Sequence, residues 1–426
     1  MSCLSGGLER LLKGAVKSEM GLGKRFGVRW ILLAVLAVLF AGPVASAQNT
    51  LHTDPLNLDP AVRDAFQHFY NLDYDGAMTR FQKVLDAHPQ DPMAVDYVLL
   101  TTAFRELYHQ DLLDTTLYAH DGFLTSKRVA VEDPAVRAQI ENLTSQAVNL
   151  SDQRIKSNSR DKDAYFTRGY ARAIHAAYIG MADHSFVSGL HQALQAKSDH
   201  QKVLQLDPQY TDAKMVIGIQ EFSVASLPGF LRLAAGMFGQ GGSKADGLKL
   251  LQDCGDHGTI TGVESRTAMT IFLRHDGRYQ EALEVQHGLA ADYPRDYLFR
   301  LEEANLTKDM GAGPHAIDVY KAVIADGAKK NYFFDPRMQL AWFGLADTER
   351  GQNHVREAAN DYLQVAAQPK CSDWLRKRAQ LNAGEMLDLL HERNQAIVQY
   401  RAAAGAADPK VADPAKQYLK TAFTGK

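Results

Sequence analysis

The sequence predicts an all-α fold built from repeated antiparallel helix pairs behind an N-terminal export signal. Blocks with small and aromatic residues at matching offsets recur along most of the chain, which is typical of helical repeats. A basic stretch, an apolar run and a small-residue triplet stand in that order near the N-terminus. With 46% hydrophobic and 23% charged residues among 426, the composition is that of an ordinary globular chain and excludes wholesale disorder.

Residues 1–47 are predicted to be a secretory signal peptide. Basic residues precede the apolar run 31–40, and an Ala-Ser-Ala triplet follows it, so we expect cleavage between Ala47 and Gln48. The region before the run is unusually long, which favours Met20 as the true translation start. An uncleaved anchor is the alternative, but ten apolar residues are short for a membrane span. We therefore expect an exported protein of the periplasm or cell envelope.

The mature chain is acidic and has few cysteines. Removing residues 1–47 takes away six basic and two acidic side chains, which leaves 41 basic and 48 acidic ones and a net charge of −7. An acidic chain gains little from polyanions, so nucleic acid is not expected as a partner. Only Cys254 and Cys371 remain. Residues so far apart in an elongated fold rarely come within disulfide range, so we expect two unpaired thiols.

The repeat pattern is clearest in the C-terminal third. The unit 339–368 has a first helix with large and small apolar residues and a second with Ala-x₃-Tyr, and the unit 377–407 keeps the same offsets. Units at 263–294 and 297–327 share the pattern, and Asp-Pro or Tyr-Pro is expected to end the second helices. The residues that carry it include Trp342, Leu345, Ala346, Ala358, Tyr362, Ala383, Gly384, Leu387, Ala396, Tyr400, Met269, Leu273, Ala282, Ala304, Ala316 and Tyr320.

On these residues the sequence resembles the tetratricopeptide-repeat (TPR) proteins, and specifically uncharacterised exported bacterial members. The resemblance is specific over 263–407, weaker at 61–92 and partial over 164–258. A short Gly-rich stretch within 223–242 also looks somewhat like the tetratricopeptide repeat protein 39 family, from which no function is transferred. The resemblance implies a right-handed superhelix of about eight to nine helix pairs, with a concave face that binds a protein or peptide.

The remaining segments are expected to belong to the same stack. The irregular region before residue 160 should contain helices at 93–108 and 134–158, and insertions should split two units, one after the helix 163–180 and one at 223–242. The predicted domains, in chain order, are the signal peptide 1–47, an N-terminal helical region 48–160 with one unit at 61–92, two split units at 161–258, regular units at 259–410 and a capping helix at 411–426.

No catalytic, cofactor or metal site is predicted, so a non-enzymatic role is expected. The Gly-rich stretch 236–244 reads Gly-Ser-Lys where a phosphate loop needs Gly-Lys-Ser or Gly-Lys-Thr, so a plain connector is favoured. The cluster 253–257 offers thiolate, imidazole and carboxylate groups, but a zinc site usually draws on a second Cys/His pair. A helix C-terminus ended by Gly255 is the favoured interpretation. His184 and His191 lack a third ligand.

The predicted binding surface is the concave face lined by the first helix of each unit. Side chains that the repeat spacing points away from the partner helix are the candidates, although they could simply be solvated polar groups. The basic residue by which chaperone-binding family members grip a C-terminal carboxylate is missing, because Leu301 stands before Asn305. The candidates are Arg274, His275, Asn305, Lys308, Asp347, Arg350, Glu385 and Asp388.

An alternative function rests on the apolar stretch 223–242, which could dock on a membrane or a membrane-protein partner. Leu227 to Phe238 fits an amphipathic helix, but Arg232 is its only basic residue, and membrane-binding helices are normally rich in them. Packing within the stack is therefore favoured over membrane contact. The identity of the protein or peptide partner and the oligomeric state are not predicted.

Overall fold

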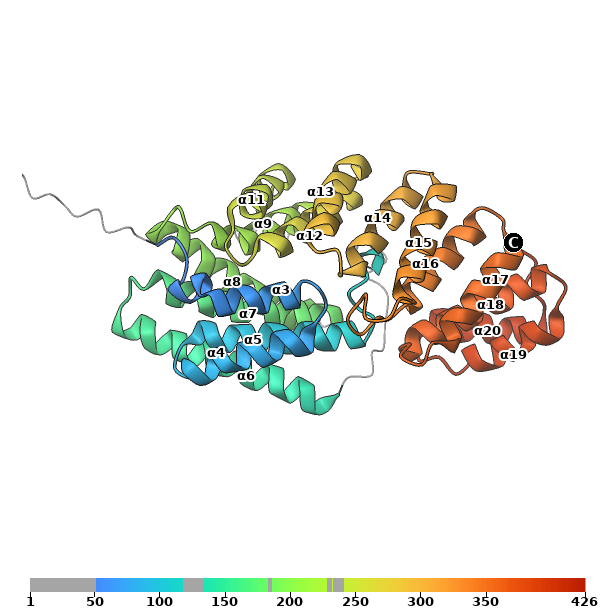
Figure 1. Ribbon diagram of the computed structural model, residues 1–426, viewed down its shortest axis with the longest axis horizontal. Coiled ribbons are helices and arrows are strands. Elements are labelled where there is room, and N and C mark those ends of the chain that lie inside the picture. Colours follow the sequence, from blue (N-terminus) through green and yellow to red (C-terminus); the bar gives the residue numbers. More distant parts are fainter. Residues whose placement is uncertain (1–50, 118–132, 183–185, 228–231, 233–240, 426) are drawn as a thin grey trace, which may run out of the picture. The chain divides into compact units, whose positions relative to one another are not determined.

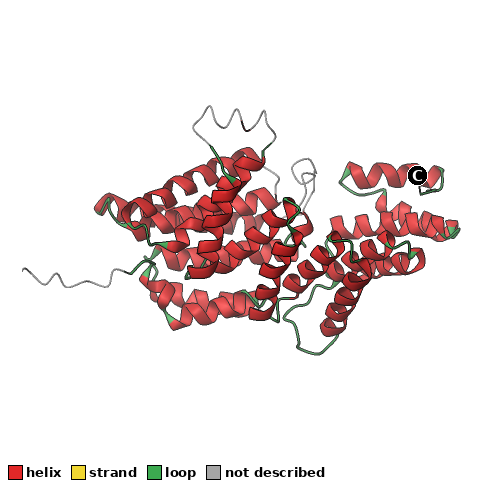
Figure 2. Ribbon diagram, turned by 90° about the horizontal axis from the view of Figure 1, so that it is seen from above, coloured by secondary structure: helices red, strands yellow, loops and turns green. Residues whose placement is uncertain are grey.

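The computed structural model describes residues 51–117, 133–182, 186–227, 232 and 241–425, and within these ranges it has seventeen α-helices and no strand (Figures 1 and 2). The contacts between residues divide the chain into two units, Met1–Leu51 and His52–Lys426. All the described helices belong to the second unit. The predicted all-α repeat fold is confirmed. The signal peptide, with its predicted cleavage site Ala47–Gln48, and most of 223–242 lie outside the described residues. None of the described helices is long and apolar enough to cross a bilayer.

In the described part of the chain, the helices pack in eight consecutive pairs and one terminal helix (Figure 1). The pairs are α3 (Pro60–Phe69) with α4 (Tyr74–Ala87), α5 (Pro92–His109) with α6 (Pro134–Ser157), α7 (Lys162–Ala182) with α8 (Phe186–Leu206), α9 (Lys214–Ser226) with α11 (Lys244–His257), α12 (Gly262–His275) with α13 (Tyr279–Asp292), α14 (Tyr297–Asp309) with α15 (Gly313–Gly327), α16 (Gln339–Gly351) with α17 (Val355–Ala367) and α18 (Asp373–Leu389) with α19 (Arg393–Ala403), and α20 (Pro409–Lys420) follows.

One type of turn recurs between the two helices of a pair. A residue just after the first helix has a positive φ, and the next N–H donates to a carbonyl five residues earlier, which satisfies a carbonyl that the helix end leaves open. The left-handed residues are Leu72, Asp111, Gly277, Gly311, Asn353 and His391. The hydrogen bonds are Asp73 N to His68 O, Leu112 N to Leu107 O, Arg278 N to Leu273 O, Ala312 N to Thr307 O, His354 N to Glu349 O and Glu392 N to Leu387 O.

Close approach at small residues holds the pairs together. A Cβ on Gly384 of α18 would lie 2.5 Å from Cε1 of Tyr400 on α19, so only glycine fits there, as the repeat pattern predicts. In the α9–α11 pair, a Cβ on Gly247 would lie 2.8 Å from the carbonyl oxygen of Gly218. The expectation of small residues at the helix–helix contacts is confirmed at these positions.

The expectation that Asp-Pro or Tyr-Pro ends second helices is confirmed at α8 and α13, which end directly before Asp207 and Tyr293. Asp-Pro also starts helices: Asp91 caps α5, whose first residue is Pro92, because proline lacks only an N–H that a helix start leaves unused. The segment after helix 163–180 is itself helical, since α8 runs from Phe186 to Leu206. One local expectation is wrong: helix α11 runs past Gly255, with Gly258 as its C-cap.

Candidate binding cavity

The first helices of the C-terminal repeats are covered by a segment from the N-terminal half of the chain. This crossing segment, residues 108–117, begins in the last turn of α5 and contains the short 3₁₀ helix η2 (Thr115–Leu117). It makes hydrogen bonds with residues at or near the first helices of four consecutive pairs, α12, α14, α16 and α18. Part of the surface that the repeats would offer to a partner is therefore already occupied by the chain itself.

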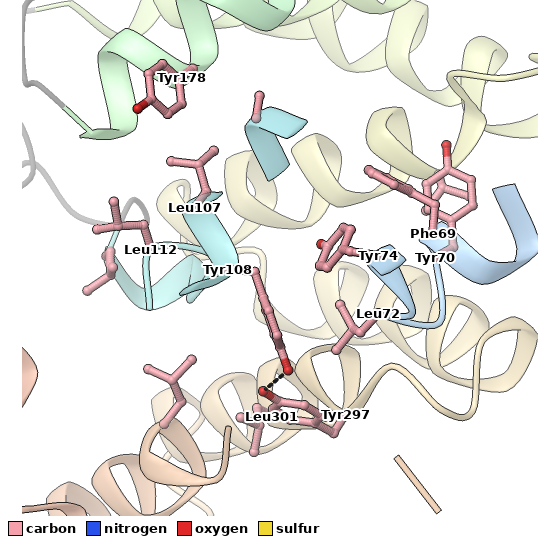
Figure 3. Packing of buried hydrophobic residues seen from close by; sticks show 14 of the residues in the cluster. Phe69, Tyr70, Leu72, Tyr74, Leu107, Tyr108, Leu112, Tyr178, Tyr297 and Leu301 are labelled. Atoms are coloured by element: carbon pink, nitrogen blue, oxygen red, sulfur yellow. Dashed lines mark hydrogen bonds between the residues drawn. The ribbon is translucent and has the colours of Figure 1, made fainter. Parts of the chain in front are cut away.

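Tyr108 fixes one end of the crossing segment against α14. Its hydroxyl lies 2.9 Å from the hydroxyl of Tyr297 and donates to the carbonyl oxygen of Asp335 at 2.8 Å (Figure 3). Both tyrosine side chains are buried. Since buried hydroxyls are costly when unpaired, this contact ties the N-terminal helices to the C-terminal repeats.

Asp111 is the polar centre of the crossing segment. Its carboxylate accepts hydrogen bonds from Arg337 Nε at 3.2 Å, Gln339 Nε2 at 2.7 Å and the backbone N–H of Ser372 at 2.9 Å. The residue is 1% exposed and its φ is 57°. Three donors from two different repeats thus converge on one buried carboxylate, which fixes the segment at the ends of α16 and α18.

The far end of the crossing segment reaches a buried charge cluster. The hydroxyl of Thr115 donates to the carboxylate of Glu302, and Arg274 Nη1 donates to Thr116 Oγ1 at 3.3 Å. Arg274 also forms ion pairs with Glu302 at 3.0 Å and, through Nε, with Asp309 at 2.8 Å. Two threonine hydroxyls of the crossing segment therefore add hydrogen bonds to a charge network that belongs to the repeats.

Beside this segment lies a cavity of about 310 Å³ between the N-terminal helices and the repeats. Most of its lining is apolar. Phe69, Tyr70, Leu72 and Tyr74 come from α3, α4 and their turn, and Leu301 comes from α14 on the other side (Figure 3). The remaining apolar lining includes Phe104, Leu113, Met181, Ile219, Val263, Ala268, Ile271, Leu298, Phe299 and Leu340.

Carboxyl groups are the main ionisable groups of the cavity wall. Glu264 accepts a hydrogen bond from the Tyr70 hydroxyl at 2.7 Å, and burial raises its pKa to about 7. Asp296 accepts from the Leu298 N–H at 2.8 Å as the N-cap of α14, and burial raises its pKa to about 8. Both groups thus hold protons more tightly than exposed carboxyls do, because a buried negative charge is costly.

Two of the predicted face residues, Arg274 and Asn305, meet at Glu302. Asn305 Nδ2 donates to Glu302 Oε2 at 3.1 Å, beside the Arg274 ion pair. Both side chains are buried, and Asn305 also lines the cavity. Their polar groups therefore serve contacts within the chain, and Asn305 is the predicted face residue that the cavity reaches.

Three of the predicted residues contact their own partner helix. Asn305, Asp347 and Asp388 each accept a hydrogen bond from the tyrosine hydroxyl of the second helix in their pair. The expectation that these side chains point away from the partner helix is therefore wrong. The sequence signal that could have predicted this contact is the tyrosine of the Ala-x₃-Tyr pattern, because its buried hydroxyl requires a hydrogen-bond acceptor. The donors are Tyr320, Tyr362 and Tyr400.

Of the other predicted face residues, Arg350, His275 and Lys308 lie nearer the surface, whereas Glu385 is buried. Arg350 Nη1 pairs with Glu385 Oε2 at 2.9 Å, which joins α16 to α18. His275 Nδ1 lies 3.3 Å from Asp276 Oδ1, and Lys308 is half-buried on α14. That these residues contact a protein or peptide partner stays a prediction.

The weaker sequence motifs form no metal or nucleophilic site in the part of the chain that the structure describes. No group of three or more candidate metal ligands occurs there. Cys254 and Cys371 are free and buried, and burial raises the pKa of each thiol to about 12. His191 lies 3.0 Å from Gln195, and His184 and most of the Gly-rich stretch lie outside the described residues.

Comparison with known proteins gives matches among solved structures alone: no family model and no curated protein matches the chain. A tetratricopeptide repeat protein from Parabacteroides merdae is 12% identical, with 76% of this chain and 97% of that one covered and a TM-score of 0.34. Yeast Tom70 is 11% identical, with 84% and 94% covered and a TM-score of 0.41. Human IFIT1, solved as a dimer with m7Gppp-AAAA, is 12% identical, with 84% and 80% covered and a TM-score of 0.43.

Likenesses at these identities and TM-scores do not indicate what this chain binds. The fold follows from the chain's own helix pairs, their recurring turn and their small-residue contacts. It is a TPR-like helical-repeat protein. Sequence reasoning found these repeats but missed Asp111, which reaches them only through the folding back of the N-terminal helices, and the cavity-lining groups Glu264 of α12 and Asp296 at the start of α14.

Proposed function

We propose that this protein is a non-catalytic protein- or peptide-binding scaffold, exported to the periplasm or cell envelope, and that the cavity receives an apolar group of the partner. The cavity carries the proposal. Its volume of about 310 Å³ lies at the lower end of the range usual for ligand sites, roughly 300–1,000 Å³. Apolar walls with a few fixed polar groups are also typical of such sites.

The cavity is held open by contacts that do not need a ligand. The Tyr70 hydroxyl, which donates to Glu264, lies 2.9 Å from the Ile260 carbonyl oxygen on one wall, and the Tyr108–Tyr297 contact ties the opposite end. A preformed site loses less conformational entropy on binding than a flexible one. An apolar side chain that enters it would be stabilised by roughly 1.5–3 kcal/mol of hydrophobic burial.

The binding proposal can be tested with peptides and a variant that fills the cavity. Short peptides selected by phage display on the mature protein should bind wild type, as measured by fluorescence anisotropy. Ala268→Trp places a large side chain in the cavity and should weaken them at least tenfold, whereas Ala291→Trp, at an exposed position of α13, should not. Equal affinities for the two folded variants would refute the cavity as the binding site.

The export proposal rests on the order of basic, apolar and small residues before Gln48. When the full chain is produced in a bacterial host, the protein in the periplasmic fraction should begin at Gln48 by N-terminal sequencing. A product that keeps residues 31–40 and pellets with the membranes would show that the segment is an uncleaved anchor.

A further inference from the structure

The carboxyl groups of the cavity wall differ in how their charge is balanced. Glu302 is neutralised by Arg274, whose Nη1 lies 3.0 Å from its Oε2. In the residues that the structure describes, the hydrogen-bond donors to Glu264 and Asp296 are a tyrosine hydroxyl and backbone N–H groups. Within the same part of the chain, neither carboxyl has a lysine or arginine at ion-pair distance, and no such residue lines the cavity.

This arrangement is unusual because an uncompensated carboxylate is costly in an apolar site. The cost is avoided when the group is protonated or when a cation stands beside it. The part of the protein that the structure describes provides no cation at these two positions. A bound molecule could provide one. A positively charged group would gain a carboxylate partner, and its attached apolar part would contact the hydrocarbon walls.

We propose that the cavity selects an apolar cation, that is, a primary ammonium group attached to a hydrocarbon or aromatic body, with Glu264 as its counter-charge. This inference rests on the proposal that the cavity is the binding site, and it names the chemistry of the group that enters. Phe69, Phe104 and Phe299 of the lining provide ring faces and edges for the body. The same chemistry occurs in a small amine and in a peptide whose free N-terminus carries an apolar side chain.

Three probes with the same phenyl group on a four-carbon chain but different polar ends separate the contribution of charge from that of hydrophobic contact. 4-Phenylbutylamine, 4-phenylbutanol and 4-phenylbutyrate are titrated into the mature protein by isothermal calorimetry at pH 8. We expect the amine to bind at least tenfold more tightly than the alcohol and the carboxylate not to bind. An alcohol that binds as tightly as the amine would overturn the proposal.

Substitution of the carboxyl tests the same point from the protein side. Glu264→Gln keeps an oxygen that can accept from Tyr70 but removes the charge, so the amine should bind at least tenfold more weakly and the alcohol equally well. Asp296→Asn changes the N-cap of α14 and leaves the Glu264 carboxyl in place, so it should weaken the amine less. The matched control is Glu303→Gln, which removes a half-buried carboxyl of α14 that pairs with His287 outside the cavity. Amine affinity unchanged in Glu264→Gln would refute the site.

The pH dependence gives a further readout. Between pH 6 and pH 8 the amine stays charged while Glu264 loses its proton, so the affinity of the amine should rise and its binding should release protons. The alcohol should show no such rise. An amine affinity that stays constant over this interval would count against Glu264 as its partner.

Peptides distinguish this inference from the scaffold proposal. Peptides with an aromatic first residue should bind with a free amine and lose at least tenfold in affinity when acetylated. If the small amine binds but no peptide does, the cation site stands and the scaffold proposal fails. If acetylated and free peptides bind equally, the scaffold proposal stands and the preference for a cation is refuted.

Discussion

The regular repeats and the α5–α6 pair start from the same turn but use it differently. After α12, α14, α16 and α18, a left-handed residue is followed within two residues by the second helix. After α5, Asp111 has the same conformation and Leu112 N donates to Leu107 O at 2.9 Å, yet α6 begins only at Pro134. The α5–α6 pair is thus a repeat with an insertion at its turn.

The difference shows how an insertion can change the surface of a helical repeat without breaking the stack. A regular turn keeps its polar groups at the edge of its own pair. The inserted turn sends the crossing segment over the first helices of distant pairs, where Asp111 meets Arg337 and Gln339. Repeat proteins usually depend on contacts between nearest neighbours, so this segment adds long-range contacts that a simple stack lacks.

The largest expected effect comes from the left-handed residue of the inserted turn. In Asp111→Gly, glycine adopts the positive φ without strain, but buried Arg337 loses its carboxylate partner. We therefore expect the free energy of unfolding, measured by urea denaturation, to fall by about 3–5 kcal/mol. The matched variant is His391→Gly, at the same position of the exposed α18–α19 turn. It should change stability by less than about 1 kcal/mol.

Equal effects of the two glycine substitutions would show that the inserted turn is no more than another helix connection. A second sign of its role would be the shape of the transition. With Asp111 replaced, the N-terminal helices and the C-terminal repeats should unfold less cooperatively, because the contacts that link them are weakened.

An intermediate effect is expected within a regular pair. Gly384→Leu forces a side chain into space that the ring of Tyr400 fills and should cost about 1–3 kcal/mol through overpacking. The control is Gly351→Ala at the exposed end of α16, where a Cβ would meet nothing within 4 Å. It should be neutral or slightly stabilising. Hydrogen exchange should place the Gly384→Leu damage in α18 to α20, and uniform loss of protection would contradict the repeat assignment.

The sequence predicted the regular pairs because their contacts are local. Gly384 and Tyr400 lie within one unit, so the spacing of small and aromatic residues already indicates that they meet. The Asp111–Arg337 contact joins residues 226 positions apart, and a lone aspartate in a polar connection carries no pattern that points to its partner. The cavity was hidden for the same reason, since its walls come from segments far apart in the sequence, such as Phe69 and Leu301.

The predicted binding face shows a second limit. Polar residues of the first helices were expected to be available to a partner, yet Asn305 and Asp388 are buried acceptors for tyrosine hydroxyls. Helical spacing alone tells which residues share a face, but not which of them satisfy a buried donor. In the sequence, the wall residues Glu264 and Asp296 look as polar as the residues of the predicted face. Only the folding back of α3 and α4 places them in an apolar site.

The two regions should also differ in how stability depends on pH. In the regular pairs, carboxylates such as Asp388 are paired, here with Arg393 at 2.9 Å. Where the N-terminal helices meet the repeats, burial raises the pKa of Glu264 to about 7 and that of Asp296 to about 8. The folded state therefore binds protons that the unfolded state has already lost near neutral pH.

The sign follows from that difference in bound protons. A carboxyl with a raised pKa destabilises the folded state once it must ionise, so the free energy of unfolding should fall as pH rises from 6 to 8. For Glu264, the fall should amount to roughly 1 kcal/mol over this interval. Glu264→Gln has no proton to lose, so its stability should fall by that much less. Buried His200, whose pKa is lowered to about 3, contributes equally to both proteins and cancels in the comparison. Parallel stability curves for wild type and Glu264→Gln would show that Glu264 is already ionised in the folded protein, and the contrast between the two regions would then rest on the inserted turn alone.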